Sequence, residues 1–212
     1  MSTVNREQLV TAALAIVDEH GSEALTMRSL AARVHRQVSS LYNHVGSREE
    51  LIEFMRGRIV ESIDTSAFSV QAWDAALESW ARSYLTAFAA HPNLIRILAT
   101  SPIRDISTFA MYDVVIGALI AAGWPLGDAV AVMRTVEAHV LGSALDIVAP
   151  SDMLAQSSVP GELTMVHAAL APEHEESTSA VASFELGFAA LLDGLRLRHA
   201  AVVGGAAGRS SS

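Results

Sequence analysis

Residues 25–51 decide the fold of this chain: LTMRSLAARV at 25–34 is followed, after HRQVS, by SLYNHVGSREEL at 40–51. Thr26 offers an N-cap hydroxyl to a short helix predicted over 27–34. A second short helix is predicted over 38–45, because its apolar residues recur at the i, i+3 and i+7 spacing of one helical face. Two short helices joined by a tight turn predict a helix-turn-helix, whose second helix enters the major groove of DNA.

The second helix of this pair leaves small polar side chains on its outer face. They are candidates for contact with base edges, although the same residues would suit a solvated face on any protein. Tyr42 is expected to meet a phosphate through its hydroxyl, or else to be a packing aromatic. Arg48 precedes a further helix, where backbone amides and a guanidinium together clamp a phosphate. The residues expected at the DNA surface are Thr26, Arg28, Arg36, Gln37, Ser39, Ser40, Tyr42, Asn43, His44 and Arg48.

The charge of the chain is unevenly distributed. Its formal net charge is -9, which argues against nucleic acid as a partner. Residues 1–60 nevertheless carry seven Arg and seven acidic residues, and 24–48 contains no acidic residue at all. Phosphate contact requires a local positive field and not a global one. The distribution therefore indicates that the N-terminal part faces DNA.

Further helices flank the pair in both directions. One is predicted over 6–20 and ends at Gly21. Another follows Ser47, which is expected to form a capping box with Glu50, and fades after Ile63 into a linker at 64–70. Pro and Gly residues then separate longer segments. Helices are expected over 71–90, just after Pro92, and over 106–122, 126–148 and 179–199, with a loop at 151–177 that contains a helical turn around 163–170.

We therefore predict an all-α protein. Its domains are a helix-turn-helix DNA-binding domain at 1–63 and a larger helical ligand-binding and dimerisation domain at 71–200, followed by a disordered tail at 201–212. A composition with 51% hydrophobic but only 6% aromatic residues favours a core of packed helices.

The composition also bears on cofactors and location. Cys is absent, which excludes disulfides and thiolate metal sites, and the eight His show no metal-ligand spacing. We expect neither a metal nor a cofactor. The sequence shows no leader-like segment and no apolar run of membrane-spanning length, so we expect a cytoplasmic protein without a membrane partner.

The segments at 25–34 and 40–51 resemble the DNA-binding signature of the tetracycline-repressor family, which they match without a gap. The resemblance implies a homodimeric transcriptional regulator, and more specifically a repressor that a small-molecule effector releases from a palindromic operator in double-stranded DNA. One departure lies in the turn, where the family usually has Gly and this chain has His35. The turn must take a conformation that a side chain tolerates, or be slightly strained.

The C-terminal part is similar to the same family, more weakly. HVLGSALD at 139–146 and FELGFAALLDGL at 184–195 resemble the two helices that pair with their mates in a four-helix dimer bundle. LATS at 98–101 stands where the tetracycline-binding members hold their drug and magnesium with a histidine. Recognition of tetracycline with magnesium is therefore not expected.

An aromatic stripe marks the larger domain. Trp80, Tyr84 and Phe88 recur at i, i+4 and i+8, which predicts core packing by default and a ligand pocket as the alternative. Arg134 and Glu137 lie at i and i+3 on a largely apolar helix, and predict an ion pair that is either structural or orients a ligand. The candidate ligand-binding residues are Trp80, Tyr84, Phe88, Met111, Met133, Arg134 and Glu137.

Other classes of function compete with a ligand-responsive repressor. A catalytic role is disfavoured, because the sequence has no nucleophile elbow, Gly-rich phosphate loop, Cys or paired carboxylates in one helical register. A protein that coats DNA without specificity should be basic overall and needs no second domain. The alternative that stays open is a small-molecule-binding helical enzyme, or a sequestering protein, without sequence-specific DNA binding.

Overall fold

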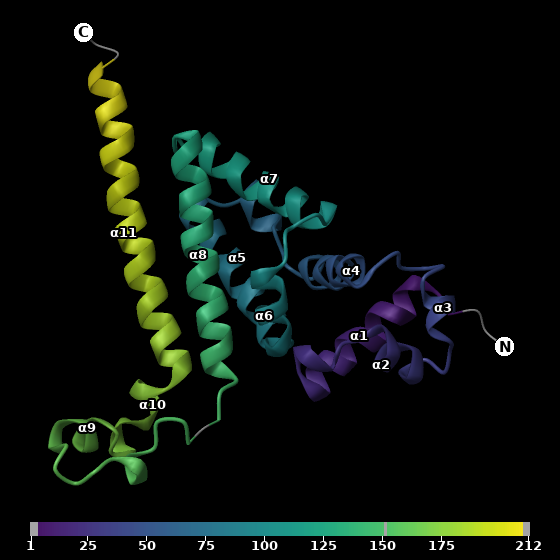
Figure 1. Cartoon of the computed structure of the whole chain (residues 1–212). Helices are drawn as coiled ribbons and strands as arrows, with labels where there is room; N and C mark the ends of the chain where they lie inside the picture. The colour runs from purple at the N-terminus through teal and green to yellow at the C-terminus, as the bar shows by residue number, and fades with distance from the viewer. Residues whose placement is uncertain (1–3, 151, 210–212) are drawn as a thin grey trace.

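The computed structural model describes residues 4–150 and 152–209, and these residues form helices and no strand. A small domain built on α1 to α3 lies at one end of the molecule, and α4 leads from it into a larger helical domain (Figure 1). The α-helices are α1 (Arg6–His20), α2 (Met27–Arg33), α3 (Val38–Leu41), α4 (Arg48–Val60), α5 (Trp73–Ala89), α6 (Pro92–Thr100), α7 (Ile106–Ala121), α8 (Leu126–Ile147), α9 (Thr164–Ala169), α10 (Glu175–Thr178) and α11 (Ala180–Arg209).

The small domain is held by caps and by one apolar centre. Thr26 caps α2 as expected: its hydroxyl accepts the Ser29 amide, while the Ser29 hydroxyl accepts the Thr26 amide. Side chains from all four helices are fully buried in the centre, and an interior of this kind fixes how α2 and α3 present their outer faces. They include Leu9, Leu30, Leu41 and Leu51.

The turn between α2 and α3 has His35 where glycine is usual, but its backbone keeps the conformation that glycine adopts. His35 has φ +52°, so its backbone lies in the left-handed region that favours Gly. The Arg36 amide donates to the Ala31 carbonyl at 2.9 Å and closes the turn. The chain therefore keeps the turn and accepts a small backbone strain at His35.

Two local expectations are corrected. The helix expected over 38–45 is regular only to Leu41; the amides of His44 and Val45 both donate to the Leu41 carbonyl, which tightens the last turn. The capping box at Ser47 is half formed, because the Ser47 hydroxyl accepts the Glu50 amide but the Glu50 carboxylate accepts the Gly46 amide instead.

The larger domain is centred on α8. This helix packs against α5, α7 and α11, and it stands beside the long α11 (Figure 1). The His139 ring of α8 stacks on Phe184 and Phe188 of α11, with centroids 5.4 and 6.1 Å apart. Gly187 permits this approach, since a Cβ there would lie 2.6 Å from the His139 ring.

The segment between α8 and α11 is more structured than a loop. It contains α9 and α10, together with the 3-10 turns Gln156–Ser158 and Pro172–His174. In Figure 1 it lies below the C-terminal end of α8 and the N-terminal end of α11. The expected disordered tail is wrong for 201–209, which continue α11; residues 210–212 lie outside the described residues. None of the helices in the described part of the chain has the length and apolarity to span a membrane.

Candidate DNA-binding surface and regulatory core

The outer face of α3 presents the side chains that the sequence singles out. Ser39, Asn43 and Gln37 are exposed, and Tyr42 is 50% exposed despite its size. Ser40 is less available, because its hydroxyl donates to the Gln37 carbonyl at 2.7 Å. The structure thus groups one aromatic hydroxyl, two amides and a free serine around one short helix.

The basic residues around α3 differ in their availability. Arg28 is exposed, and its side chain has no hydrogen bond or ion pair to the described residues. Arg33 is already neutralised, since it pairs with both carboxylate oxygens of Glu19. Arg36 donates to the carbonyl of His35. The positive field that the sequence predicts therefore does not come equally from every Arg.

Three of the residues predicted to contact DNA also hold the small domain together. The Nε of Arg48 donates to the carbonyl of Leu25 at 3.0 Å and ties the start of α4 to the start of α2. The carbonyl of His44 accepts Arg6 Nε at 3.4 Å. The hydroxyl of Thr26 accepts the capping hydrogen bond of α2. These three residues lie beside the recognition face with part of their polar capacity already used.

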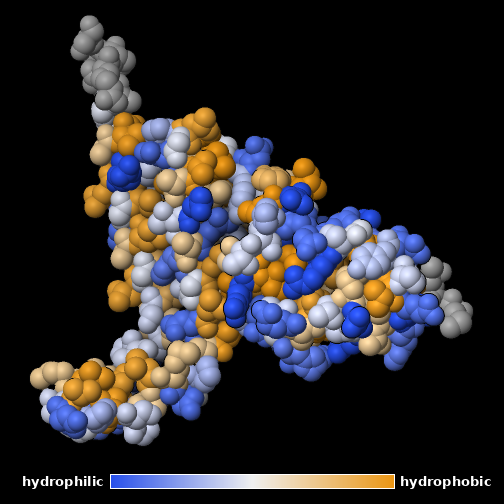
Figure 2. All heavy atoms as spheres, viewed as in Figure 1, coloured by the Kyte–Doolittle hydropathy of each residue, from blue (hydrophilic) through white to orange (hydrophobic). Residues whose placement is uncertain are grey.

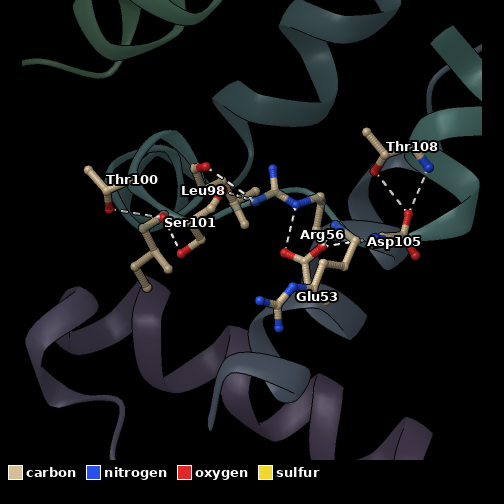
Figure 3. Close-up of polar contacts among 9 residues, drawn as sticks. Glu53, Arg56, Leu98, Thr100, Ser101, Asp105 and Thr108 are labelled. Carbon is tan, nitrogen blue, oxygen red and sulfur yellow. Dashed lines mark hydrogen bonds and ion pairs between the residues drawn. The ribbon is translucent and has the colours of Figure 1, made fainter.

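The junction between the domains is a polar cluster that the sequence analysis missed (Figure 3). Arg56 of α4 is only 6% exposed. Its guanidinium donates to the carbonyls of Leu98 and Ser101 at 3.2 and 3.1 Å, and to the Glu53 carboxylate at 3.0 Å. Because these carbonyls end α6, the cation also opposes the negative end of that helix.

The second carboxylate oxygen of Glu53 extends the junction. It accepts the backbone amides of Arg104 and Asp105. Asp105 then caps α7, as its carboxylate accepts the amide of Thr108 at 2.7 Å and the hydroxyl at 2.9 Å (Figure 3). A Cβ at Gly57 would lie 2.6 Å from this carboxylate. One turn of α4 thereby fixes both the end of α6 and the start of α7.

The aromatic stripe of α5 is buried in the larger domain. Trp80, Tyr84 and Phe88 are at most 5% exposed. Tyr84 and Phe88 stack in parallel with centroids 4.8 Å apart, while Trp80 meets Tyr84 edge-on at 5.4 Å. Met111 and Met133 are buried as well. The structure brings together five of the seven residues proposed for a ligand in one apolar core.

Comparison with known proteins identifies both parts of the chain. Residues 9–55 match the model of the tetR family of bacterial regulatory proteins, and residues 69–199 match the tetracyclin repressor-like C-terminal domain. The chain belongs to the TetR family.

Three relatives of this TetR-family regulator illustrate the likeness. The repressor DrrR1 of Streptomyces coeruleorubidus is 29% identical over 67% of this chain, which spans only 53% of DrrR1. The class A tetracycline repressor of transposon 1721 in Escherichia coli is 28% identical over 95% of each chain. The crystal structure of Streptomyces coelicolor ActR with (S)-DNPA has 25% identity and a TM-score of 0.75, over 93% of this chain and 99% of that one.

The expected ion pair between Arg134 and Glu137 of this TetR-family chain is absent among the described contacts. Arg134 is exposed, whereas Glu137 turns into the core and accepts the Tyr84 hydroxyl at 3.2 Å. Tyr112 of α7 also acts on this carboxylate and lowers its pKa. The i, i+3 spacing does not give an ion pair because Glu137 faces Tyr84 of α5, whereas Arg134 lies on an exposed part of α8.

Burial controls the ionisation of this cluster. It raises the pKa of Glu137, against the two tyrosine hydrogen bonds, which lower it. Burial and the nearby Glu137 likewise raise the pKa of Tyr84 and of Tyr112. The Nε1 of Trp80 is buried and has no hydrogen-bond acceptor among the described residues. The core around Glu137 therefore contains a carboxylate whose burial costs free energy, and an indole N–H without an acceptor among the described residues.

The raised pKa of Glu137 predicts how stability depends on pH. The folded state holds the Glu137 proton more tightly than the unfolded state, so stability falls as pH rises above the usual range of a carboxyl group. The substitution Glu137→Gln keeps an acceptor for the tyrosines and removes the charge. Urea unfolding should show a smaller loss of stability between pH 5 and pH 8 in this variant than in the wild type. A larger loss in the variant would contradict the assignment.

Proposed function

We propose that this TetR-family chain is a homodimeric transcriptional repressor that binds a palindromic operator and leaves it when a small molecule enters the larger domain. The observation that carries the proposal is the exposed polar face of α3, joined through Arg56 to a core that buries Glu137. The proposed division is DNA binding by 1–63 and ligand binding with dimerisation by 71–200. Its site of action is the cytoplasm, and no catalytic role is proposed.

In the proposed complex, α3 enters the major groove. Ser39, Gln37 and Asn43 face the base edges, and the hydroxyl of Tyr42 meets a phosphate. Arg28, which has no ion pair among the described residues, contacts the phosphate backbone of the DNA. The rest of the proposed contact surface consists of Thr26, Arg36, Ser40, His44 and Arg48.

Tyr42 and Asn43 should therefore behave differently when replaced by Ala. After a preferred duplex is selected from a randomised pool, Tyr42→Ala should weaken binding to that duplex and to a scrambled one by similar factors. Asn43→Ala should weaken the selected duplex alone, by about 1–3 kcal/mol. Fluorescence anisotropy at one fixed salt concentration measures both. The proposed roles fail if Tyr42→Ala relaxes the preference at one base pair and leaves scrambled DNA unaffected.

The proposed dimer forms through α8 and α11. Leu186 and Leu197 of α11 are each 76% exposed, and Ala190 and Gly194 lie between them on the same face. This spacing gives an apolar stripe with room for a helix to approach closely. Figure 2 shows hydrophobic residues gathered along the side of the molecule that α8 and α11 form. Two copies would place their recognition helices about 34–36 Å apart, one turn of DNA.

A single charge on this stripe should break the dimer. Leu197→Asp should yield monomers at micromolar concentration, because two carboxylates would be buried in the symmetric interface. Val70 is 81% exposed and lies outside both helices, so Val70→Asp is a matched control that should remain dimeric. Sedimentation velocity measures both variants. A dimeric Leu197→Asp protein would show that α11 does not form the interface.

The proposed effector site is the core around Glu137. Trp80, Tyr84, Phe88, Met111 and Met133 supply apolar walls, and Glu137 supplies a polar anchor. Arg134, which is exposed, takes part only if the helices move. The name of the ActR structure records a bound small molecule, (S)-DNPA, in a relative of the same fold. An effector that replaces a tyrosine hydroxyl at Glu137 would have to separate α5, α7 and α8.

Release from DNA would then pass through the junction. Helix α6 packs against α8, and the end of α6 is bonded to Arg56. A shift of α6 therefore moves α4, and α4 carries the helix-turn-helix. A coupling free energy of about 1–3 kcal/mol changes the operator affinity by about five- to 150-fold.

Arg56→Gln should disturb the spacing of the two recognition helices without changing either one. Affinity for the full palindrome should fall about fivefold or more, while affinity for an isolated half-site stays unchanged. Gly57→Ala, which displaces Asp105, should act in the same direction. Arg82→Gln is the control, because Arg82 pairs with Glu78 and Glu185 away from the junction. Equal losses on full site and half-site would contradict a role in spacing.

A further inference from the structure

A polar cleft of about 250 Å³ lies on the junction, apart from the core around Glu137. Its walls come from the 3-10 turn Ser22–Ala24, from the first residue of α4, and from the C-terminal half of α6. One wall thus belongs to the DNA-binding domain and the other to the regulatory domain. The lining residues are Ser22, Glu23, Arg48, Arg96, Ile97, Thr100 and Ser101.

Two guanidinium groups border this cleft with most of their donors unused. Arg48 is partly buried, and its Nε donates to the Leu25 carbonyl. None of its remaining N–H groups has an acceptor among the described residues. Arg96 is exposed, and its side chain has no hydrogen bond or ion pair within the described part of the chain. The single carboxylate in the lining, Glu23, is exposed and pairs with neither Arg. The cleft therefore carries net positive charge.

The hydroxyl groups of the cleft are divided between donors and acceptors. The Ser22 hydroxyl makes no hydrogen bond to the described residues and is a free donor. Thr100 and Ser101 line the cleft and each donate to carbonyls inside α6, so their hydroxyl oxygens can only accept from a ligand. A phosphate group that carries one proton matches this set, because it accepts from guanidinium and hydroxyl groups and donates one hydrogen bond.

We propose that this cleft binds a small phosphate-type dianion, held between Arg48 and Arg96, and that the bound anion weakens DNA binding. The volume is large enough to admit such an ion and is below that of pockets for drug-sized molecules. The anion ties the two domains together across the cleft. It also occupies Arg48, which the proposed function assigns to a DNA phosphate.

The anion site can be tested without DNA. Inorganic phosphate is titrated calorimetrically into the full chain, with chloride adjusted to keep the ionic strength constant. One saturable site per chain is expected, and Arg96→Gln should weaken it at least about tenfold, since it removes one of two charged partners. Arg104→Gln is the matched control, because Arg104 is an exposed Arg in the next loop that does not line the cleft. Equal phosphate binding by Arg96→Gln and the wild type would overturn the site.

The regulatory effect rests on the proposed function and needs a second measurement. At a saturating phosphate concentration, the dissociation constant for the selected duplex should rise about fivefold in the wild type and stay unchanged in Arg96→Gln. Without phosphate the two proteins should bind DNA equally, as Arg96 lies in α6 and not on the DNA surface. Phosphate binding without a change in DNA affinity would overturn the regulatory effect. A chain that binds no duplex at all would instead overturn the proposed function, and leave the calorimetric result standing.

Discussion

The buried guanidinium of Arg56 is the contact on which the arrangement of the two domains depends. A cation that is only 6% exposed must be compensated, and its three partners lie on two parts of the chain: Glu53 on α4, and the carbonyls of Leu98 and Ser101 at the end of α6. Loss of any one partner leaves this cation with fewer acceptors in a site that is nearly closed to water. The orientation of α4 relative to α6 is therefore specified by geometry and not only by apolar contact.

The same logic explains why the regulatory core contains a carboxyl group. Glu137 accepts the Tyr84 hydroxyl, and Tyr112 and Arg56 also lower the pKa of its carboxyl group. Apolar side chains alone would pack α5, α7 and α8 without the free-energy cost of burying a carboxyl group. A polar cluster that is kept in spite of its cost gives these helices one preferred register, and in the proposed function it is the group for which the effector competes.

Much of the small domain follows from local sequence, since caps, apolar spacing and turn residues act within a few positions. The interval 25–51 predicts two helices and their turn, and Thr26 caps α2 as predicted. The junction was missed because Arg56 binds residues more than 40 positions away, which no spacing rule detects. Arg134 and Glu137 were paired wrongly because helical spacing does not say which side of α8 is covered. The Gly-rich segment after 203 predicts disorder by composition, yet it continues α11.

The position of Arg56 also bears on how such regulators recombine. The proposed boundary between the domains lies near residue 63 in sequence, but α4 packs against α1 of the first domain and against α5, α6 and α7 of the second. A chimaera that joined residues 1–63 to a foreign regulatory domain would separate Arg56 and Glu53 from the carbonyls at the end of α6 and the amides before α7 that they bind here. Exchange of DNA-binding specificity is therefore cleaner when it is confined to residues before α4. For this chain the modular unit is the helix pair 25–45, and not the whole N-terminal domain.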